Sequence, residues 1–263
     1  MSSIRKSTQL KLRVFAGPNG SGKSTVIKSV REYKLKGVAI DFGTYINADD
    51  IAKSLLYGNF SFNQFQIIVQ YKEFEEVVLG SGLINPNFDT ASFKASFKIQ
   101  DNSLLLLKPK SVEYLAQIIA YYVQEKLLNE KKRFSFETVF SHGSKLSIMQ
   151  QAKEQGYKVY LYFVSTESTE INIARVASRV AQGGHDVPVD KIVSRYYRSL
   201  DFLYKACQIV DAVYFFDNST EGSGSNLFAN FKKVKGVKQW DIAEQEKVPN
   251  WFREYYSKKV TPP

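Results

Sequence analysis

Apolar residues recur along the chain with two periods, and segments of the two kinds alternate. Residues 10–16 (LKLRVFA) and 158–164 (KVYLYFV) are rich in β-branched and aromatic residues, which is typical of strands. In contrast, the apolar residues of 113–132 (EYLAQIIAYYVQEKLLNEKK) recur at helical spacing. The pattern therefore predicts strands and helices in succession.

The predicted elements follow one another mostly as strand, helix, strand. Strands that alternate with helices predict a parallel sheet covered by helices on both faces, so the expected fold class is α/β. We expect one domain over residues 1–263, with a helical insertion at about 58–112, where the regular pattern is lost. The expected strands are 10–16, 44–47, 133–138, 158–164 and 212–218, and the expected helices are 25–34, 51–57, 113–132, 145–155, 169–181 and 190–207.

The first strand leads directly into a glycine-rich loop, GPNGSGKST, that precedes a helix. The loop satisfies the pattern G-x-x-x-x-G-K-[ST], whose glycines let backbone N–H groups point at phosphate oxygens. In such a loop Lys23 neutralises phosphate charge and Ser24 offers a hydroxyl to Mg²⁺. The alternative is a plain tight turn. The candidate nucleotide-binding residues are Gly17, Pro18, Asn19, Gly20, Ser21, Gly22, Lys23, Ser24 and Thr25.

Carboxylates follow two of the other predicted strands. Asp49 and Asp50 come after the strand at 44–47, where one of them can accept the proton of an acceptor hydroxyl. Asp49 is the first candidate and Asp50 competes with it, while the plain alternative for either is helix capping. Glu137 ends the strand at 133–138, where its carboxylate suits sugar hydroxyls or water on Mg²⁺.

Two arginines, Arg175 and Arg179, lie four residues apart and hence on one face of a predicted helix. Lids of phosphoryl-transfer enzymes lower arginines onto migrating charge in this way. Because surface arginines at this spacing are common, a solvated face is the alternative. The glycines Gly183 and Gly184 after the helix can act as a hinge.

Composition narrows the classes of protein and of partner. The chain has 36 Lys and Arg against 26 Asp and Glu, a formal net charge of +10, which favours an anionic partner. The single cysteine, Cys207, excludes an internal disulfide, and with two histidines a zinc site of Cys and His is excluded too. No apolar run approaches the roughly 20 residues that span a bilayer, and no secretory signal is evident, so a cytoplasmic protein without membrane association is expected.

Five segments together resemble the zeta-toxin-like P-loop kinases. They occur in that family's order and cover most of the chain except 58–112 and the two ends. The resemblance implies an ATP- and Mg²⁺-dependent kinase, whose characterised members phosphorylate the 3'-hydroxyl of UDP-N-acetylglucosamine. The segments are VFAGPNGSGKST, YINADDIA, RFSFETVFS, RVASRVAQGGHDVPVDKIVSRYYRSL and YFFDNS.

Carried over position by position, the resemblance implies a set of site residues. Lys23 and Ser24 match the phosphate loop, and Asp49 matches the general base. Glu137 contacts substrate, with Thr138 beside it, although Thr138 suits a turn cap equally well. Arg175 and Arg179 become catalytic residues of a lid at 168–200, and Asn218 lies near the adenine. Where the toxins place a second catalytic arginine this chain has His185, a candidate substrate contact or a loop-structuring residue.

The expected function is ATP-dependent phosphorylation of a small hydroxyl acceptor, a sugar nucleotide such as UDP-N-acetylglucosamine being one candidate. Two alternatives use the basic charge: a nucleotide-dependent binding protein and a polynucleotide 5'-hydroxyl kinase. Absence of an LSGGQ-like signature disfavours a transporter ATPase, and absence of an N-K-x-D motif disfavours a GTPase. An acidic antitoxin protein is a candidate partner, whereas nucleic acid is not favoured.

Overall fold

The computed structural model describes residues 9–184, 186–220, 224–242 and 248–260. It divides into two compact units, one of Met1–Phe42 with Glu137–Pro263 and the other of Gly43–Phe136. We call them the phosphate-loop unit and the inserted unit. The inserted unit begins before the insertion expected at 58–112 and ends after it, and the expectation of a single domain stays a prediction.

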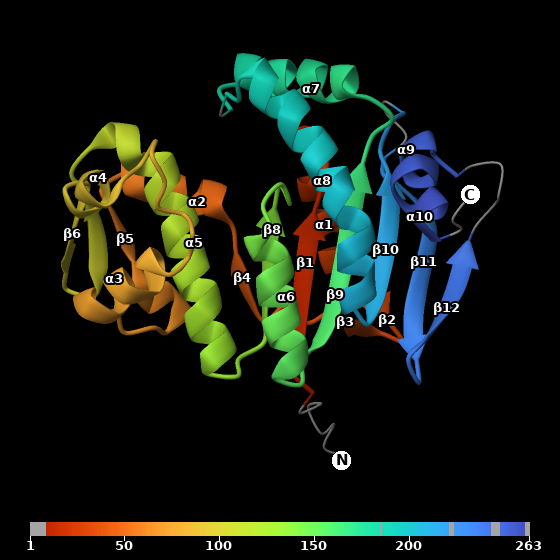
Figure 1. Cartoon of the computed structure of the whole chain (residues 1–263), viewed down its shortest axis with the longest axis horizontal. Helices are drawn as coiled ribbons and strands as arrows, with labels where there is room; N and C mark the ends of the chain where they lie inside the picture. Colours follow the sequence, from red (N-terminus) through yellow and green to blue (C-terminus); the bar gives the residue numbers. More distant parts are fainter. Residues whose placement is uncertain (1–8, 185, 221–223, 243–247, 261–263) are drawn as a thin grey trace. The chain divides into compact units, whose positions relative to one another are not determined.

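The phosphate-loop unit is built on a mixed sheet with strand order β12-β11-β10-β9-β1 (Figure 1). β1, β9 and β10 are parallel, whereas β11 and β12 are antiparallel extensions that the sequence pattern did not predict. The register aligns the carboxyl ends of the three parallel strands, so the residues that follow them share one edge. The bounds are β1 (Lys11–Ala16), β9 (Lys158–Ser165), β10 (Ala212–Asp217), β11 (Asn226–Val234) and β12 (Val237–Ile242).

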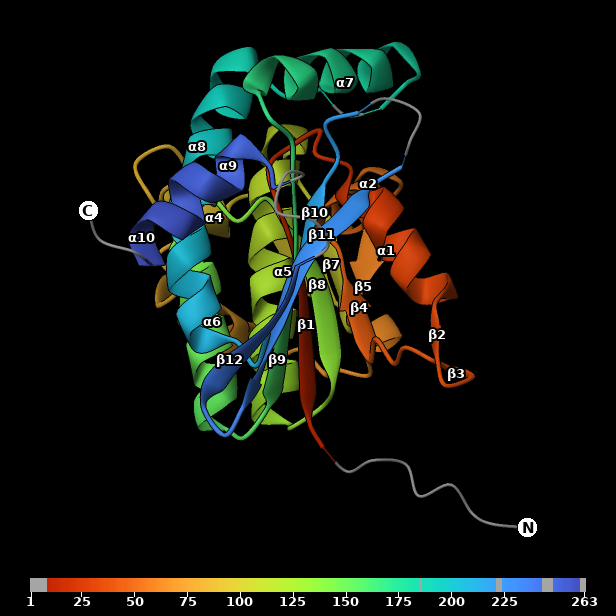
Figure 2. The same cartoon turned by 90° about the vertical axis from the view of Figure 1, so that its right-hand side faces the viewer.

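Helices cover both faces of this sheet, with α1 on one side and α6 and α8 on the other (Figure 2). Burial on both faces explains why β9 consists of nearly continuous apolar residues and why every residue of β1 after Lys11, Arg13 included, is buried. The predicted α/β class, with a mostly parallel sheet and flanking helices, is confirmed. The bounds are α1 (Lys23–Glu32), α6 (Ser144–Glu154), α7 (Thr169–Ala181) and α8 (Val189–Ile209).

The two helices of the expected lid, α7 and α8, pack against each other through their own small apolar cluster. Val176, Val187 and Ile192 form its buried centre, with Ile173 and Val180 around it. His185, which lies between these helices in the sequence, is outside the described residues. The arginines of α7 are therefore carried on a helix that is anchored to α8 along one apolar stripe.

The inserted unit contains helices together with a small sheet. β4 (Thr44–Ile46) pairs in parallel with the first residues of β8 (Phe134–Thr138), and α2 (Ala48–Leu56) packs on α5 (Val112–Asn129). Between α2 and α5, the expected helices are present as α3 and α4, accompanied by an antiparallel sheet of order β5-β7-β6. The bounds are β5 (Asn59–Ser61), α3 (Tyr71–Leu79), α4 (Thr90–Lys94), β6 (Phe97–Gln100) and β7 (Ser103–Leu106).

Aromatic side chains form the core of the inserted unit. Phe62, Phe74 and Tyr122 are buried, and their rings make edge-on contacts with centroids 5.0–6.2 Å apart. This core explains the abundance of Phe in a segment without clear sequence periodicity.

The remaining elements are short. No helix in the described ranges is both long and apolar enough to cross a membrane. The short elements are β2 (Lys34–Leu35), β3 (Val38–Ala39), the 3-10 turns η1 (Phe62–Phe65) and η2 (Pro109–Ser111), and the C-terminal turns α9 (Asn250–Phe252), η4 (Arg253–Ser257) and α10 (Lys258–Val260).

Candidate active site

Two glycines of the phosphate loop are required by close contacts. Gly17 has φ +150°, and a Cβ there would lie 2.0 Å from the backbone oxygen of Val164. Gly22 has φ +89°, and its Cβ would lie 2.0 Å from Nδ2 of Asn218. No other residue fits at Gly17 without moving the neighbouring strand, so the loop is held against the carboxyl ends of β9 and β10.

Lys23 begins α1 and is buried, with 7% of its surface exposed. Its Nζ donates to the Pro18 backbone oxygen at 3.0 Å and lies 3.8 Å from Oε1 of Glu137. The backbone N–H of Gly17 donates to the Thr138 oxygen at 3.3 Å, which ties the loop to the end of β8. The structure thus brings Lys23, Glu137 and Thr138 together, and the roles predicted for them remain predictions.

Asn218 contacts the loop directly. Its Nδ2 donates to the Ser21 backbone oxygen at 2.9 Å, and its own N–H donates to the Ser165 oxygen at 2.9 Å. Asn218 therefore bridges the loop and the ends of two strands, as a residue at the edge of a nucleotide site can do. Its predicted place beside the adenine is not tested by these contacts.

A C-terminal residue that the sequence did not single out supports this turn. Trp251 donates its indole N–H to Oδ1 of Asp217 at 3.0 Å, and Asp217 also accepts from the Ser219 hydroxyl at 2.8 Å. The Asn250 N–H donates to Oε1 of Glu167 at 2.8 Å. Trp251 is distant in sequence from Asp217, so no local pattern predicts this contact. The contact exists only once the C-terminal segment packs on β10.

The start of α7 is packed against the phosphate loop. A Cβ at Gly20 would lie 2.6 Å from the Asn172 backbone oxygen, and Asn172 is itself buried and accepts from the Thr166 hydroxyl at 2.6 Å. Burial raises the pKa of the Tyr196 phenol, which donates to the Thr166 oxygen at 2.7 Å. The protonated phenol and the Thr166 hydroxyl thus hold the base of the lid helices at the loop.

The arginines of the lid differ in their surroundings. Nη1 of Arg175 is buried and makes no hydrogen bond within the described residues, although a guanidinium N–H is a strong donor. Arg179 is exposed, and its side chain lies over Gly184, where a Cβ would come within 2.5 Å of its Cγ. A third arginine, Arg195 of α8, lies 3.5 Å from Oδ1 of Asn19 in the phosphate loop. Of these three arginines, Arg195 is the one that a described contact places at the phosphate loop.

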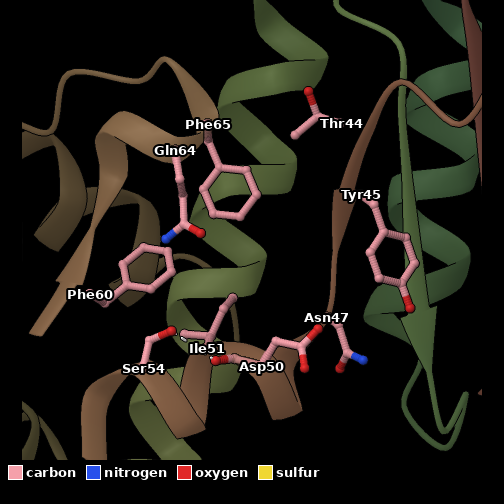
Figure 3. A pocket seen from close by; sticks show the side chains of 9 residues that line it. All are labelled: Thr44, Tyr45, Asn47, Asp50, Ile51, Ser54, Phe60, Gln64 and Phe65. Atoms are coloured by element: carbon pink, nitrogen blue, oxygen red, sulfur yellow. Dashed lines mark hydrogen bonds between the residues drawn. The ribbon is translucent and has the colours of Figure 1, made fainter. Parts of the chain in front are cut away.

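The two candidate bases lie in the inserted unit, in the first turn of α2. The Asn47 side chain caps this helix by accepting from the Asp49 N–H at 2.9 Å, so neither aspartate is the cap residue. Both aspartates are exposed. Asp50 lines a cavity of about 300 Å³, whose described lining does not include Asp49 (Figure 3).

The loop suits nucleotide phosphates on structural grounds. Ser21 is fully buried, and its Oγ is without a partner among the described residues. The first turn of α1 contains no acidic residue, and no side chain caps it. Its backbone N–H groups can therefore donate hydrogen bonds to an anionic oxygen. The described residues contain no cluster of three or more Asp, Glu, His or Cys that could hold a metal ion. Mg²⁺ would therefore rely on Ser24, water and the nucleotide itself.

Comparison with known proteins confirms the resemblance to the zeta toxins. The model of the zeta toxin family matches residues 110–229, a range that contains Glu137, Arg175 and Arg179 and leaves out the phosphate loop. An uncharacterized protein of Haemophilus influenzae (strain Rd) is 38% identical over 63 residues, 24% of this chain. The chain covers about 45% of that relative's length.

Two chains of solved structures share the fold at low identity, and a third is similar at a lower TM-score. A chain of the AvrRxo1-ORF1:AvrRxo1-ORF2 complex with sulphate ions is 14% identical with a TM-score of 0.56, over 98% of this chain and 66% of that one. A chain of the complex with ATP is 13% identical, with the same TM-score and the same coverage of both chains. A chain from the PezAT toxin-antitoxin system of Streptococcus pneumoniae is 13% identical with a TM-score of 0.46, over 97% and 79% of the two chains.

Proposed function

We propose that this protein is an ATP- and Mg²⁺-dependent kinase that phosphorylates a small hydroxyl acceptor, with UDP-N-acetylglucosamine as the first candidate. The observation that carries the proposal is the pairing of buried Lys23 with Glu137 beside a phosphate loop that only glycine can form. The family match and the shared fold support a kinase-like P-loop enzyme. The identity of the acceptor rests on the resemblance alone.

The residues of the phosphate-loop unit act on the donor. ATP, when bound, supplies the γ-phosphoryl group. In this proposal Lys23 exchanges its contacts with Pro18 and Glu137 for phosphate oxygens and neutralises their charge. Ser24 contributes a hydroxyl to Mg²⁺, and the buried N–H groups of Arg175 stabilise charge that develops during transfer. Asn218 keeps the loop in shape through its bond to Ser21.

Two carboxylates act on the acceptor, Asp49 of the inserted unit and Glu137 of the phosphate-loop unit. Asp49 accepts the proton of the acceptor hydroxyl or orients that hydroxyl, and its position in an exposed first helical turn leaves it accessible. Glu137, at the end of β8, positions the acceptor or metal-bound water once Lys23 has moved to phosphate. A protein that only binds and hydrolyses nucleotide as a switch has no need for these two carboxylates. Their presence therefore favours phosphoryl transfer to an acceptor over nucleotide binding alone.

The test is a transfer assay with γ-labelled ATP, Mg²⁺ and a panel of sugar nucleotides, nucleosides and RNA. We expect label on a sugar nucleotide or another small hydroxyl compound, with Lys23→Ala as the inactive control. Label on RNA ends would favour the polynucleotide kinase alternative, for which the net charge of +10 is the supporting observation. Binding of ATP without transfer to any acceptor would contradict the proposal.

An acidic antitoxin protein is the proposed protein partner. The net charge of +10 suits such a partner, and the structural relative with sulphate was solved as a complex of two gene products. Because a contact between charged surfaces is screened by salt, we expect the affinity for the partner to fall as ionic strength rises. Co-purification of the chain with the product of an adjacent gene at low and high salt tests this part of the proposal.

A further inference from the structure

The outer edge of the sheet in the phosphate-loop unit is formed by β12, and no strand pairs with its other side within the described ranges (Figure 1). β12 pairs with β11 through a two-residue turn, with φ of 50° at Lys235 and 83° at Gly236. In such a turn the flanking residues, Val234 and Val237, exchange both of their backbone hydrogen bonds. The N–H and C=O groups along β12 therefore alternate between β11 and the open edge.

Three residues of β12 direct their backbone polar groups to the open edge. Those of Gln239 and Asp241 point to β11, so those of Lys238, Trp240 and Ile242 point away from it. In the described part of the chain, none of these three has a backbone hydrogen bond outside the pairing with β11. The edge thus offers a row of backbone donors and acceptors to a further strand.

β12 lacks the features by which proteins usually protect an edge strand. It has six residues, contains no proline, and its register with β11 is not broken by a bulge. Its lysine, Lys238, does not cover the edge. The Nζ of Lys238 donates to the Tyr256 hydroxyl at 3.0 Å and lies 4.9 Å from the ring centroid of Phe231 in β11. The edge is therefore open to pairing.

Aromatic packing on one face holds the strand in place. The ring centroid of Trp240 lies 4.8 Å from that of Phe231 and 5.5 Å from that of Tyr256. Even so, 38% of Trp240 and 44% of Ile242 are exposed on this face, and on the opposite face Val237 is 67% exposed. Apolar surface thus flanks the open edge on both faces, and a preformed strand reduces the entropy lost when a partner binds.

The charge of the hairpin indicates the chemistry of a partner. β11, β12 and their turn contain one acidic residue, Asp241, and four lysines, none of which forms an ion pair within the described ranges. Burial lowers the pKa of the Lys238 ammonium, and burial together with the Lys238 charge lowers the pKa of Lys233. Carboxylates of a partner would compensate this charge, so complementarity favours an acidic occupant. The lysines are Lys232, Lys233, Lys235 and Lys238.

We propose that the open edge of β12 binds an extended acidic segment of a partner protein, which adds a strand to the sheet. Its backbone pairs with Lys238, Trp240 and Ile242, and its carboxylates lie beside the lysines of the hairpin. β9, β10 and β11 separate β12 from β1, so the added strand lies about 24 Å from β1, at a strand spacing of about 4.8 Å. The docking site is distinct from the phosphate loop and does not depend on the proposed kinase function.

The test uses a synthetic ten-residue peptide of alternating Glu and Val as the probe, with amide NMR spectra of the whole chain. We expect shifts and slower hydrogen exchange at the amides of Lys238, Trp240 and Ile242, and an affinity that falls as salt is raised. A fully N-methylated peptide keeps the charge but cannot donate backbone hydrogen bonds, so it should not bind. A peptide of alternating Lys and Val keeps the strand propensity and should bind at least about tenfold more weakly.

Ile242→Pro and Ile242→Val are the matched variants of the chain. Proline removes an N–H from the open edge without removing a bond to β11, so the peptide should bind about tenfold more weakly. Valine keeps that N–H and should bind the peptide as the wild type does. If a thermal melt shows that Ile242→Pro does not fold, Lys232→Glu replaces it, because it reverses one exposed charge and should weaken binding by about threefold to tenfold.

Four results would overturn the inference. The Glu and Val peptide does not bind the wild type, or it binds no better than its N-methylated form. The Trp240 amide is already protected from exchange in the free monomeric chain, which would mean that the edge is covered. The chain forms a dimer that Ile242→Pro abolishes, which would make a second copy the occupant. ATP binding measured by calorimetry should be unchanged by the peptide, and a chain without kinase activity that binds the peptide would refute the proposed function alone.

Discussion

The phosphate loop and the cavity of the inserted unit are built in opposite ways. The loop is defined by backbone, because Gly17 and Gly22 leave no room for a Cβ against Val164 and Asn218. The cavity is defined by side chains on α2 and on the segment 58–65, and several of them are partly exposed. The difference indicates that the shape of the loop is fixed by sterics, whereas the lining of the cavity can change by substitution without refolding the chain.

The two regions also differ in charge. Cationic side chains lie at the loop: Lys23 is buried in it, and Arg195 contacts Asn19. In the described lining of the cavity, by contrast, Asp50 is the one charged residue. The loop therefore suits an anionic ligand, whereas the cavity does not. Variants in the two regions should therefore differ in their effect on the use of ATP.

Lys23→Ala should cause the largest loss. Removal of the buried ammonium leaves phosphate charge without compensation, so turnover should fall by more than about 10³-fold while the fold persists. Labelled-phosphate transfer and a thermal melt measure the two effects. Lys28→Ala, an exposed change on the same helix, is the control. Normal turnover in Lys23→Ala would remove the assignment of the loop as the donor site.

Asp49→Asn separates the two adjacent carboxylates. It keeps size and hydrogen-bonding shape but removes the proton acceptor, so kcat should fall by roughly 10²- to 10⁴-fold with ATP affinity unchanged. Asp50→Asn should instead cause little change in kcat. Steady-state kinetics with the acceptor varied distinguishes the two. The reverse outcome, an active Asp49→Asn and a dead Asp50→Asn, would exchange their roles.

Arg175→Ala tests whether this partly buried arginine of the lid acts in transfer. Its Nη1 is without a partner within the described part of the chain, so it is available when phosphate arrives. We expect kcat to fall by about 10²- to 10³-fold, with ATP affinity nearly unchanged. For Arg179→Ala, at an exposed position, the expected fall in kcat is smaller. Equal losses in both variants would show that the depth of burial does not decide which arginine acts.

Trp251→Phe should have the smallest effect of the series. It keeps the aromatic packing but removes the hydrogen bond to Asp217, which supports the turn that carries Asn218. We expect KM for ATP to rise by about threefold to tenfold with kcat retained. Trp240→Phe, on the edge strand β12, serves as the matched control. A kcat effect without a change in KM would contradict this positioning role.

Local signals in the sequence predicted the elements around the phosphate loop and the long helix α5, but not the antiparallel strands β11 and β12 or the small sheet of the insertion. The strand, loop and helix around Gly22 are contiguous, and α7 begins and ends at the expected residues 169 and 181. In contrast, β5, β6 and β7 have three or four residues each; β6 and β7 form a local hairpin, and β5 forms only by pairing across more than 40 positions, as between Phe60 and Leu104. Such strands are too short for a period to appear.

The residues of the candidate site also fall into two groups, those that the sequence pattern predicts and those that only tertiary packing reveals. Lys23, Glu137 and Asn218 end or begin elements that the pattern predicts, and the structure brings them to one edge of the sheet. Asn172 packs on the loop and Trp251 supports the turn beside it through tertiary packing, which no motif signals. Arg195 falls within the fourth of the segments that resemble the zeta toxins, but its contact with Asn19 depends on how α8 packs. The cavity needed both β4 and the insertion, so it could not be recognised from either segment alone.

The central claim is phosphoryl transfer from ATP to a hydroxyl acceptor, and the balance of products tests it most directly. ADP, free phosphate and phosphorylated acceptor should be measured together in one reaction with UDP-N-acetylglucosamine and Mg²⁺, for the wild type and for Lys23→Ala. We predict one phosphorylated acceptor for each ADP in the wild type and neither product with Lys23→Ala. ADP accompanied only by free phosphate, across the whole acceptor panel, would contradict the claim and identify a nucleotide-hydrolysing binding protein.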